Sequence, residues 1–348
     1  MSHFKNYIGS EFLTTEFPKR DWLIENICRK NDSVILVGNE KSGKSLFVFQ
    51  LLCSLTSCHP FLDLYNVPKA LKVVYIQLEG EIADSQDRMK RMIKTLDINS
   101  DNFHLRFSAP LNLEEKGFSD GLAMDILKNF NPKGKVAGQE VIKPDIVIID
   151  PIYFAFTGSL NEDEDVRAFL GNLRTFKDTL DCAIILVHHT HKTRLNYKGN
   201  VIEEGDEALF GSKFLKAWAD HILLFMFDKK TKLRTLSCDT QRSGDIITAC
   251  ELRLIEPEPL YFEKVDKEQT KDLIVVDLLK REDFREGLLV EDIRNKLGIS
   301  STSFYRSIKH PLAQNMIVKS TTRPMKYSYN WERDRGAGLH LEKTCGKD

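Results

Sequence analysis

The sequence lacks several features that mark special classes of protein. It contains no apolar run of roughly 18 residues, so we expect no membrane-spanning helix. The first residues, MSHFKNYIGSEF, lack a basic stretch followed by an apolar one, and a secretory signal is therefore not expected. The seven scattered cysteines form no CxxC pair, which argues against a zinc site or disulfide framework and predicts reduced thiols in a cytoplasmic protein.

Neither sign of charge is in excess, because 50 Lys and Arg residues stand against 51 Asp and Glu residues. The net charge therefore says nothing about binding to nucleic acid, although the distribution of charge can. Hydrophobic residues at 42 % and charged residues at 29 % are typical of a globular chain with a core. The 348 residues exceed the roughly 150 of an ordinary domain, so we expect one large domain or two.

Apolar, β-prone runs alternate with helix-like stretches from about residue 30 to 265, which predicts an α/β fold with a mostly parallel sheet. Because these runs do not alternate with polar residues, helices should cover both faces of the sheet. We expect strands at residues 34–37, 73–78, 103–107, 146–150, 183–188 and 222–227. The segments LRTLSCDT and ELRLIEP then predict hairpin-like strands along one edge.

A charged stretch, VDKEQTKD at residues 265–272, predicts a domain boundary. We therefore expect an α/β domain over residues 1–265 that includes an N-terminal lead-in segment. A small second domain should follow over residues 266–331, and residues 332–348 should form a disordered tail.

A phosphate-binding loop is the most specific motif. Residues 38–45 read GNEKSGKS, a full match to GxxxxGK[ST], between an apolar strand and a helix-like stretch. Backbone N–H groups of such a loop, together with the positive end of the next helix, can hold a triphosphate. Lys44 would reach the β- and γ-phosphates, and the Ser45 hydroxyl would bind Mg²⁺. The expected nucleotide-binding residues are Gly38, Asn39, Glu40, Lys41, Ser42, Gly43, Lys44, Ser45 and Leu46.

Three carboxylates are candidates for the chemistry of hydrolysis. Asp150 ends an apolar strand, where a doubly wound sheet places its ligands, and would bind Mg²⁺ with Ser45 unless it is only a solvated strand end. Because Pro151 follows Asp150 directly, the group that activates water must come from elsewhere. Glu79, at the end of VVYIQLEGE, is the first candidate and Glu81 the second, against an ordinary helix-start glutamate.

These motifs, with a later strand ending in His188-His189, resemble the RecA-like ATPases. Within that group the chain is most similar to the RepA-type plasmid helicases and their DnaB-type relatives, whose lead-in also resembles TEFPKRDWLIENIC. The resemblance covers residues 10–262. It implies a RecA-like domain that binds ATP and Mg²⁺, and a homo-oligomer, hexameric in form, with single-stranded DNA in a central channel.

The resemblance also assigns roles to later residues. His188 or His189 would sense the γ-phosphate, since a neutral imidazole can donate to a phosphate oxygen. A metal site from His188, His189 and His191 is the alternative, although neighbouring strand residues point to opposite faces. Arg242, in the segment TQRSG, would act on the nucleotide of a neighbouring subunit; Thr240 stands where the family has a second cation, unless Arg242 is only an exposed loop residue.

The long polar segment at residues 190–206 corresponds to the DNA-contacting loop of the family. Its expected DNA contacts are Lys192, Arg194, Tyr197 and Lys198. The acidic residues 203, 204 and 206 count against this role, and a solvated loop is the alternative.

The order helix, helix, helix and hairpin over residues 267–331 predicts a winged-helix domain. From Ile293 to Trp331 there are seven Lys or Arg residues and no acidic residues. This local positive charge is suited to contact with the phosphate backbone of nucleic acid. The expected DNA contacts are Ser301, Thr302, Ser303, Tyr305, Arg306, Lys309, Arg323 and Lys326. Docking of another protein is the alternative use of this domain.

Three hypotheses follow for the function. The chain is an ATP-driven ring that moves along or unwinds DNA for a plasmid, phage or mobile element. Alternatively, it is an ATPase that loads or regulates replication or transposition proteins, or a DNA-binding regulator switched by nucleotide.

Overall fold

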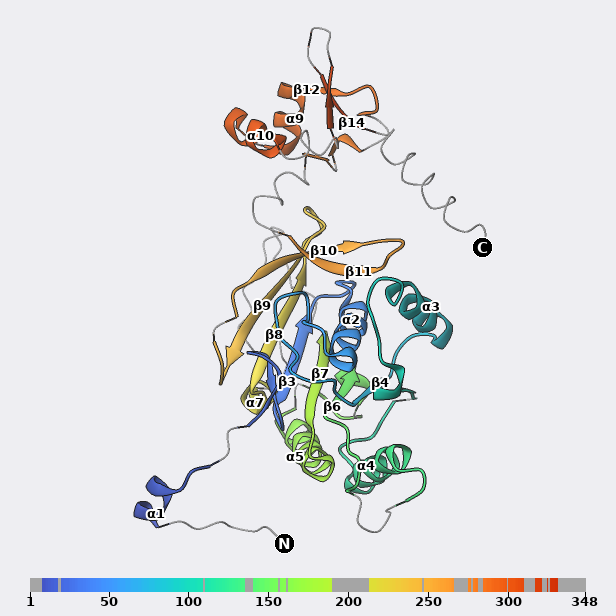
Figure 1. The fold of residues 1–348 in the computed structure, drawn as a ribbon, viewed down its shortest axis with the longest axis vertical. Helices are drawn as coiled ribbons and strands as arrows, with labels where there is room; N and C mark the ends of the chain where they lie inside the picture. Colours follow the sequence, from blue (N-terminus) through green and yellow to red (C-terminus); the bar gives the residue numbers. More distant parts are fainter. Residues whose placement is uncertain are drawn as a thin grey trace, which may run out of the picture. The chain divides into compact units, whose positions relative to one another are not determined.

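The computed structural model describes residues 8–330 except 18–19, 109, 135–139, 156, 161, 190–212, 246, 266–274, 277, 281–283, 299, 310–316, 321–323 and 325 (Figure 1). Contacts divide the chain into two compact units. The first comprises Met1–Phe227, Arg234–Ala249 and Leu254–Phe262, and the second Asp228–Leu233, Cys250–Arg253 and Glu263–Asp348. The expected domain limits at residues 265 and 331 stay predictions, and the expected tail lies outside the described residues.

A nine-stranded sheet forms the centre of the fold, in the order β11-β10-β9-β8-β3-β7-β6-β4-β5. Its strands are β3 (Ser33–Gly38), β4 (Val73–Gln77), β5 (Phe103–Phe107), β6 (Ile146–Asp150), β7 (Ala183–His189), β8 (His221–Phe227), β9 (Arg234–Gln241), β10 (Cys250–Ile255) and β11 (Tyr261–Val265). The six strands from β5 to β8 pair in parallel, and β9 pairs antiparallel with β8. The predicted α/β class with a mostly parallel sheet is therefore confirmed.

Helices bury both faces of the sheet. The helices that precede or follow the strands are α1 (Gly9–Thr14), α2 (Lys44–Ser57), α3 (Ile82–Met92), α4 (Lys116–Phe130), α5 (Asp163–Leu180) and α7 (Lys213–Trp218), with the short turns η1 (Ser100–Asn102) and η2 (Ile152–Phe154). Of these, α1 has no buried residue and does not cover the sheet. Alternate residues of β3, β4, β6 and β7 share one core cluster with α4 and α5. On the other face α2 contributes Phe49, whose ring meets Tyr75 edge-on at 5.6 Å. Burial on both faces explains the continuous apolar runs.

Parallel pairing brings the carboxyl ends of the central strands to one edge of the sheet and their amino ends to the other. Gly38 lies opposite His189, and Gln77 lies opposite Asp150. The carboxyl ends of β3, β4, β6 and β7 therefore lie side by side, as Figure 1 shows for the strands. A small antiparallel pair, β1 (Trp22–Ile24) with β2 (Cys28–Arg29), precedes β3.

The second unit has its own small core. It contains α9 (Val290–Leu297), α10 (Ser301–Ser307) and a sheet in the order β12-β14-β13, made of Leu288–Leu289, Lys326–Tyr329 and Ile317–Lys319. Ile293, Phe304, Ile317 and Tyr327 belong to one buried cluster. Much of the expected first helix lies outside the described residues, and the winged-helix assignment stays a prediction.

The cysteines of the described residues form no disulfide bond. Cys28, Cys53, Cys58, Cys182, Cys238 and Cys250 are free, while Cys345 lies beyond the described residues. Within the described ranges, no helix combines the length and the apolar character needed to cross a membrane.

Candidate nucleotide site

The phosphate loop joins β3 to α2 through two positions that require glycine. Gly43, directly before α2, has a φ of 92°, in the left-handed region that side chains disfavour. Gly38 lies so close to β8 that an added Cβ atom would stand 2.3 Å from the Phe225 carbonyl oxygen. The loop is also attached to β8 by Asn39, whose side chain donates to the Phe227 carbonyl and accepts from its amide. This close packing attaches the start of the loop to β8.

Lys44 is folded into the loop. Its Nζ atom donates to the carbonyl oxygens of Gly38 at 2.8 Å and Asn39 at 2.9 Å, and only 4 % of the residue is exposed. Burial lowers the pKa of Lys44 to about 8, against the opposing charges of Asp150, Glu40 and Glu79. The ammonium group thus lies in the loop that would hold the phosphates, with carbonyl oxygens as its acceptors.

Ser45 and Asp150 meet behind the loop, and a tyrosine joins them. The Tyr75 hydroxyl donates to Oδ2 of Asp150 at 2.7 Å, and the Ser45 hydroxyl is also hydrogen-bonded to Asp150. Burial raises the pKa of Asp150, while the hydrogen bonds from Tyr75 and Ser45 and the charge of Lys44 act in the opposite direction. A buried carboxylate beside a hydroxyl is a set of hard oxygen donors, which fits Mg²⁺.

Glu79 lies beyond the end of β4 and reaches a second tyrosine. Its Oε2 atom accepts a hydrogen bond of 2.7 Å from the Tyr153 hydroxyl, on η2. The charge of Glu79 acts on Lys44, Asp150 and His189, and its partner Tyr153 also contacts the His189 ring. Glu81 instead is the exposed residue that precedes α3. Of the two candidate carboxylates, Glu79 is therefore the one whose surroundings include the other expected site residues.

The two histidines at the end of β7 point to different faces. His188 is buried and follows Ile184 and Leu186, which belong to the core shared with α4 and α5. His189 lies opposite Gly38, is half-buried, and meets the Tyr153 ring edge-on at 5.5 Å. Burial lowers the pKa of His189, as does the charge of Lys44. His189 is therefore the histidine beside the phosphate loop.

The alternative metal site finds no support in the described part of the chain. No group of three His, Cys, Asp or Glu residues there is arranged to hold a metal ion. The third histidine of that hypothesis, His191, lies outside the described residues.

Arg242 lies at the opposite edge of the sheet. Because β9 runs antiparallel to β8, Arg234 pairs with Phe227 near the phosphate loop, and Gln241 pairs with His221 at the far end. A strand rises about 3.3 Å per residue, so the two ends of β8 are about 20 Å apart. Arg242 is exposed, and its guanidinium lies 3.7 Å from the Asp220 carboxylate. It is thus remote from the phosphate loop of its own chain.

Two further residues, Arg234 and Phe262, support the loop. Arg234 donates from Nε to the Ser42 carbonyl at 3.2 Å and lies over the Phe227 ring. Phe262, on β11, exchanges two backbone hydrogen bonds with the Gln50 side chain of α2 and stands beside Gly43. Both supports come from strands distant in the sequence, and no local motif marks them.

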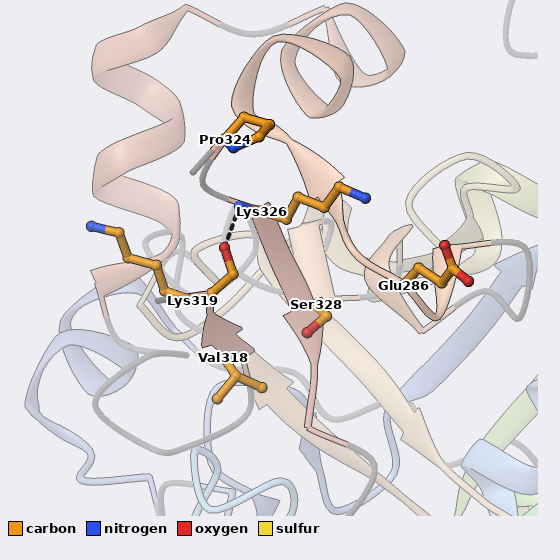
Figure 2. A pocket seen from close by; sticks show the side chains of 7 residues that line it. Glu286, Val318, Lys319, Pro324, Lys326 and Ser328 are labelled. Carbon is orange, nitrogen blue, oxygen red and sulfur yellow. Dashed lines mark hydrogen bonds between the residues drawn. The ribbon is translucent and has the colours of Figure 1, made fainter. Parts of the chain in front are cut away.

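The expected DNA contacts are only partly described. Lys192, Arg194, Tyr197, Lys198 and Arg323 lie outside the described residues, as do the side chains of Thr302, Ser303 and Arg306. Ser301, Tyr305 and Lys309 are exposed on or just after α10. Lys326 lines a pocket of about 390 Å³ with Glu286, Val318, Lys319, Ser320, Pro324 and Ser328. Figure 2 shows Lys319 and Lys326 extending in different directions from neighbouring strands.

Comparison with known proteins gives one family match. A family model named AAA_25 and described as an AAA domain matches residues 4–194. No curated protein matches the chain. The match and the sheet order agree with the RecA-like P-loop ATPase recognised from the sequence.

Three solved structures illustrate the similarity, and each is matched by 68 % of this chain. The first, an isolated ATPase domain, is 14 % identical, with a TM-score of 0.48 over 86 % of its length. The RadB recombinase is 17 % identical, with a TM-score of 0.42 over 91 %. A DnaB-like replicative helicase, studied with its primase interactions, is 14 % identical, with a TM-score of 0.48 over 58 %.

Proposed function

Because this chain belongs to the AAA_25 family of AAA domains, we propose that it is a Mg²⁺-dependent ATPase that couples hydrolysis to movement along, or unwinding of, DNA. Its motif set resembles that of RepA-type helicases, which favours a role in replicating a plasmid, phage or mobile element. The observation that carries the proposal is the meeting of Lys44, Ser45, Asp150, Glu79 and His189 at one edge of the sheet.

Each group has a role that its surroundings support. Lys44 binds the β- and γ-phosphates, because phosphate oxygens are stronger acceptors than the carbonyls it now contacts. Ser45 and Asp150 hold Mg²⁺, which would neutralise phosphate charge when bound. Glu79 takes a proton from water, whose oxygen bonds to the γ-phosphorus as the bond to the ADP oxygen breaks. His189 contacts the γ-phosphate and responds to its loss.

Arg242 supports an oligomer. Since it lies about 20 Å from the phosphate loop of its own chain, it can serve only a nucleotide bound by another subunit. An arginine supplied in this way stabilises the charge that develops on the transferred phosphoryl group. The family resemblance favours a ring of six subunits.

DNA would be bound at two places. The segment at residues 190–206 supplies Lys192, Arg194, Tyr197 and Lys198 to single-stranded DNA in the channel. The second unit contributes basic side chains, among them Lys309 and Lys326, that are suited to phosphate-backbone contact.

The test combines two assays on the purified full chain. Single-stranded DNA should raise the rate of ATP hydrolysis, and a forked duplex should be separated in the presence of ATP and Mg²⁺. Absence of any DNA stimulation would contradict the coupling and favour a nucleotide-switched DNA-binding regulator.

A loader or regulator of other replication or transposition proteins is the second candidate. Thr240 favours it, because the family's second cation near the arginine is missing. DNA-stimulated hydrolysis without strand separation would select this candidate.

A further inference from the structure

Tyr153 is a phenol in the nucleotide site to which the proposed function gives no role. It lies on η2, three residues beyond Asp150, and its hydroxyl donates to Oε2 of Glu79 at 2.7 Å. The same ring meets His189 edge-on, with 5.5 Å between ring centroids and 68° between ring planes. Tyr153 therefore touches the expected general base and the expected γ-phosphate sensor at once.

The backbone on the tyrosine side of this contact is fixed. Ile152 and Ala155, before and after Tyr153 in the chain, are fully buried. The Leu111 amide donates to the Phe154 carbonyl at 2.7 Å, and the Leu113 amide to the Ala155 carbonyl at 3.0 Å. The turn thus presents the phenol from a rigid support, although 37 % of Tyr153 is exposed.

The backbone on the glutamate side is fixed as well. The Gln77 side chain donates to the Glu79 carbonyl at 2.7 Å, and the Leu78 amide donates to the Asp150 carbonyl at 2.8 Å. What stays adjustable is the Glu79 side chain, which is exposed and has several rotatable bonds. A single hydrogen bond to one carboxylate oxygen is enough to select among its rotamers.

We propose that Tyr153 is a positioning residue for Glu79: it holds Oε2 so that Oε1 faces the attacking water. This inference rests on the proposed role of Glu79 as general base. A base must lie within hydrogen-bond reach of the proton that it removes, and small misplacements lower rates steeply. The contact with His189 also restricts the Tyr153 ring. The position of Glu79 therefore depends on His189, the expected γ-phosphate sensor.

The test removes only the hydroxyl. Tyr153→Phe keeps the ring and its contact with His189, so the fold should be unchanged. We expect kcat to fall about tenfold, as for the loss of one hydrogen bond to a charged group, with KM and the Kd for ATP unchanged. Tyr65→Phe is the matched control, because it removes a phenol that lies beside Phe61 and has no part in the proposed mechanism, and it should keep the wild-type kcat.

The effect of Tyr153→Phe in a Glu79→Asp variant shows whether Tyr153 acts through Glu79. Glu79→Asp shortens the carboxylate, which withdraws it from the phenol while leaving a base. Adding Tyr153→Phe to Glu79→Asp should change kcat by less than about twofold. An unchanged kcat in Tyr153→Phe alone, a raised KM instead of a lowered kcat, or the full tenfold loss in the Glu79→Asp background would each overturn the inference.

Glu79→Gln separates this inference from the proposed function. Wild-type turnover in Glu79→Gln would refute the role of Glu79 as base. Loss of turnover in Glu79→Gln together with a fully active Tyr153→Phe would refute the role of Tyr153 alone.

Discussion

Lys44 holds its charge in a buried place, where neutral carbonyl oxygens are its hydrogen-bond acceptors. Burial lowers its pKa to about 8, which shows how incompletely these acceptors replace water. Anionic phosphate oxygens in the same position would form stronger, charge-assisted hydrogen bonds. The side chain is therefore prepared for an anion before one arrives.

Lys44→Ala should weaken ATP binding by at least about 100-fold and abolish measurable hydrolysis, because it removes two charge-assisted hydrogen bonds worth about 1.5–3 kcal/mol each. Calorimetric titration with ATP and Mg²⁺ measures the affinity. Lys69→Ala, an exposed lysine paired with Asp145, is the control and should bind ATP as the wild type does. Unchanged affinity in Lys44→Ala would refute the site.

Some site residues could be predicted because their signal is local. The loop from Gly38 to Ser45 and the strand ending in Asp150 are marked by short motifs that carry their own chemistry. Tyr75 and Tyr153 could not be found in this way. Tyr75 meets Asp150 only because β4 and β6 pair in the observed register, and Tyr153 meets Glu79 only because η2 follows β6.

At the scale of the element, β3 is followed by the phosphate loop and preceded by a buried charged residue. Its carboxyl end opens into the phosphate loop, and its amino end follows Asp32, which is fully buried. Asp32 accepts hydrogen bonds from Arg20 at 2.6 Å and from the Arg29 amide at 2.8 Å. Its Oδ2 atom lies 3.6 Å from Nε2 of the buried His221. The same histidine nitrogen lies 3.2 Å from the Ser243 hydroxyl, next to Arg242.

Burial raises the pKa of Asp32, but the nearby His221, the hydrogen bond from the Arg29 amide and the charge of Arg20 outweigh it, so the pKa lies below its usual value of 3.8. A carboxyl group whose pKa is lower in the folded state stabilises that state above its unfolded pKa. The contribution should therefore be complete above pH 3.8 and be lost as the pH falls through the native pKa.

Asp32→Asn should lower the free energy of unfolding by about 3 kcal/mol at neutral pH, since it removes the anion from a buried cluster. Urea denaturation followed by circular dichroism measures the change. Asp181→Asn is the control, because Asp181 forms a largely exposed pair with Lys30 that should contribute less than about 1 kcal/mol. Equal stability of the two variants would contradict this account.

The strands show where local sequence stops being informative. The six parallel strands were predicted to within one residue at each end, because burial on both faces produces continuous apolar runs. A continuous apolar run does not show which face of the sheet each side chain lies on. The sequence therefore could not decide whether His188 or His189 is the candidate γ-phosphate sensor. β11 was not predicted, because a five-residue strand with two charged side chains has no distinctive pattern.

At the scale of the whole molecule, the site is expected to be completed between subunits. Arg242→Ala should lower turnover by about 10³-fold, as for other arginines supplied across an interface. Mixed with the inactive Lys44→Ala protein, it should regain activity, since roughly a quarter of the interfaces would pair an intact Lys44 with an intact Arg242. Hydrolysis that stays at the level of the separate variants would count against this geometry.

Removal of residues 267–348 should leave the basal ATPase in place, because Lys44, Glu79, Asp150 and Arg242 all lie in the first unit. Affinity for DNA should fall, and its dependence on salt should become less steep as Lys and Arg contacts are lost. Fluorescence anisotropy at several salt concentrations measures both quantities. An unchanged salt slope would assign the second unit to protein docking instead.

The distance between the two ends of β8 has a consequence for stoichiometry. Arg242 and the phosphate loop lie at opposite ends of β8, so a head-to-tail series of subunits would bring each arginine to the phosphate loop of the next subunit, as its proposed role requires. In a closed ring every nucleotide would meet an arginine, whereas an open chain would always leave its terminal nucleotide without one. Turnover per subunit should accordingly rise with the length of an open polymer but be constant once the ring has closed.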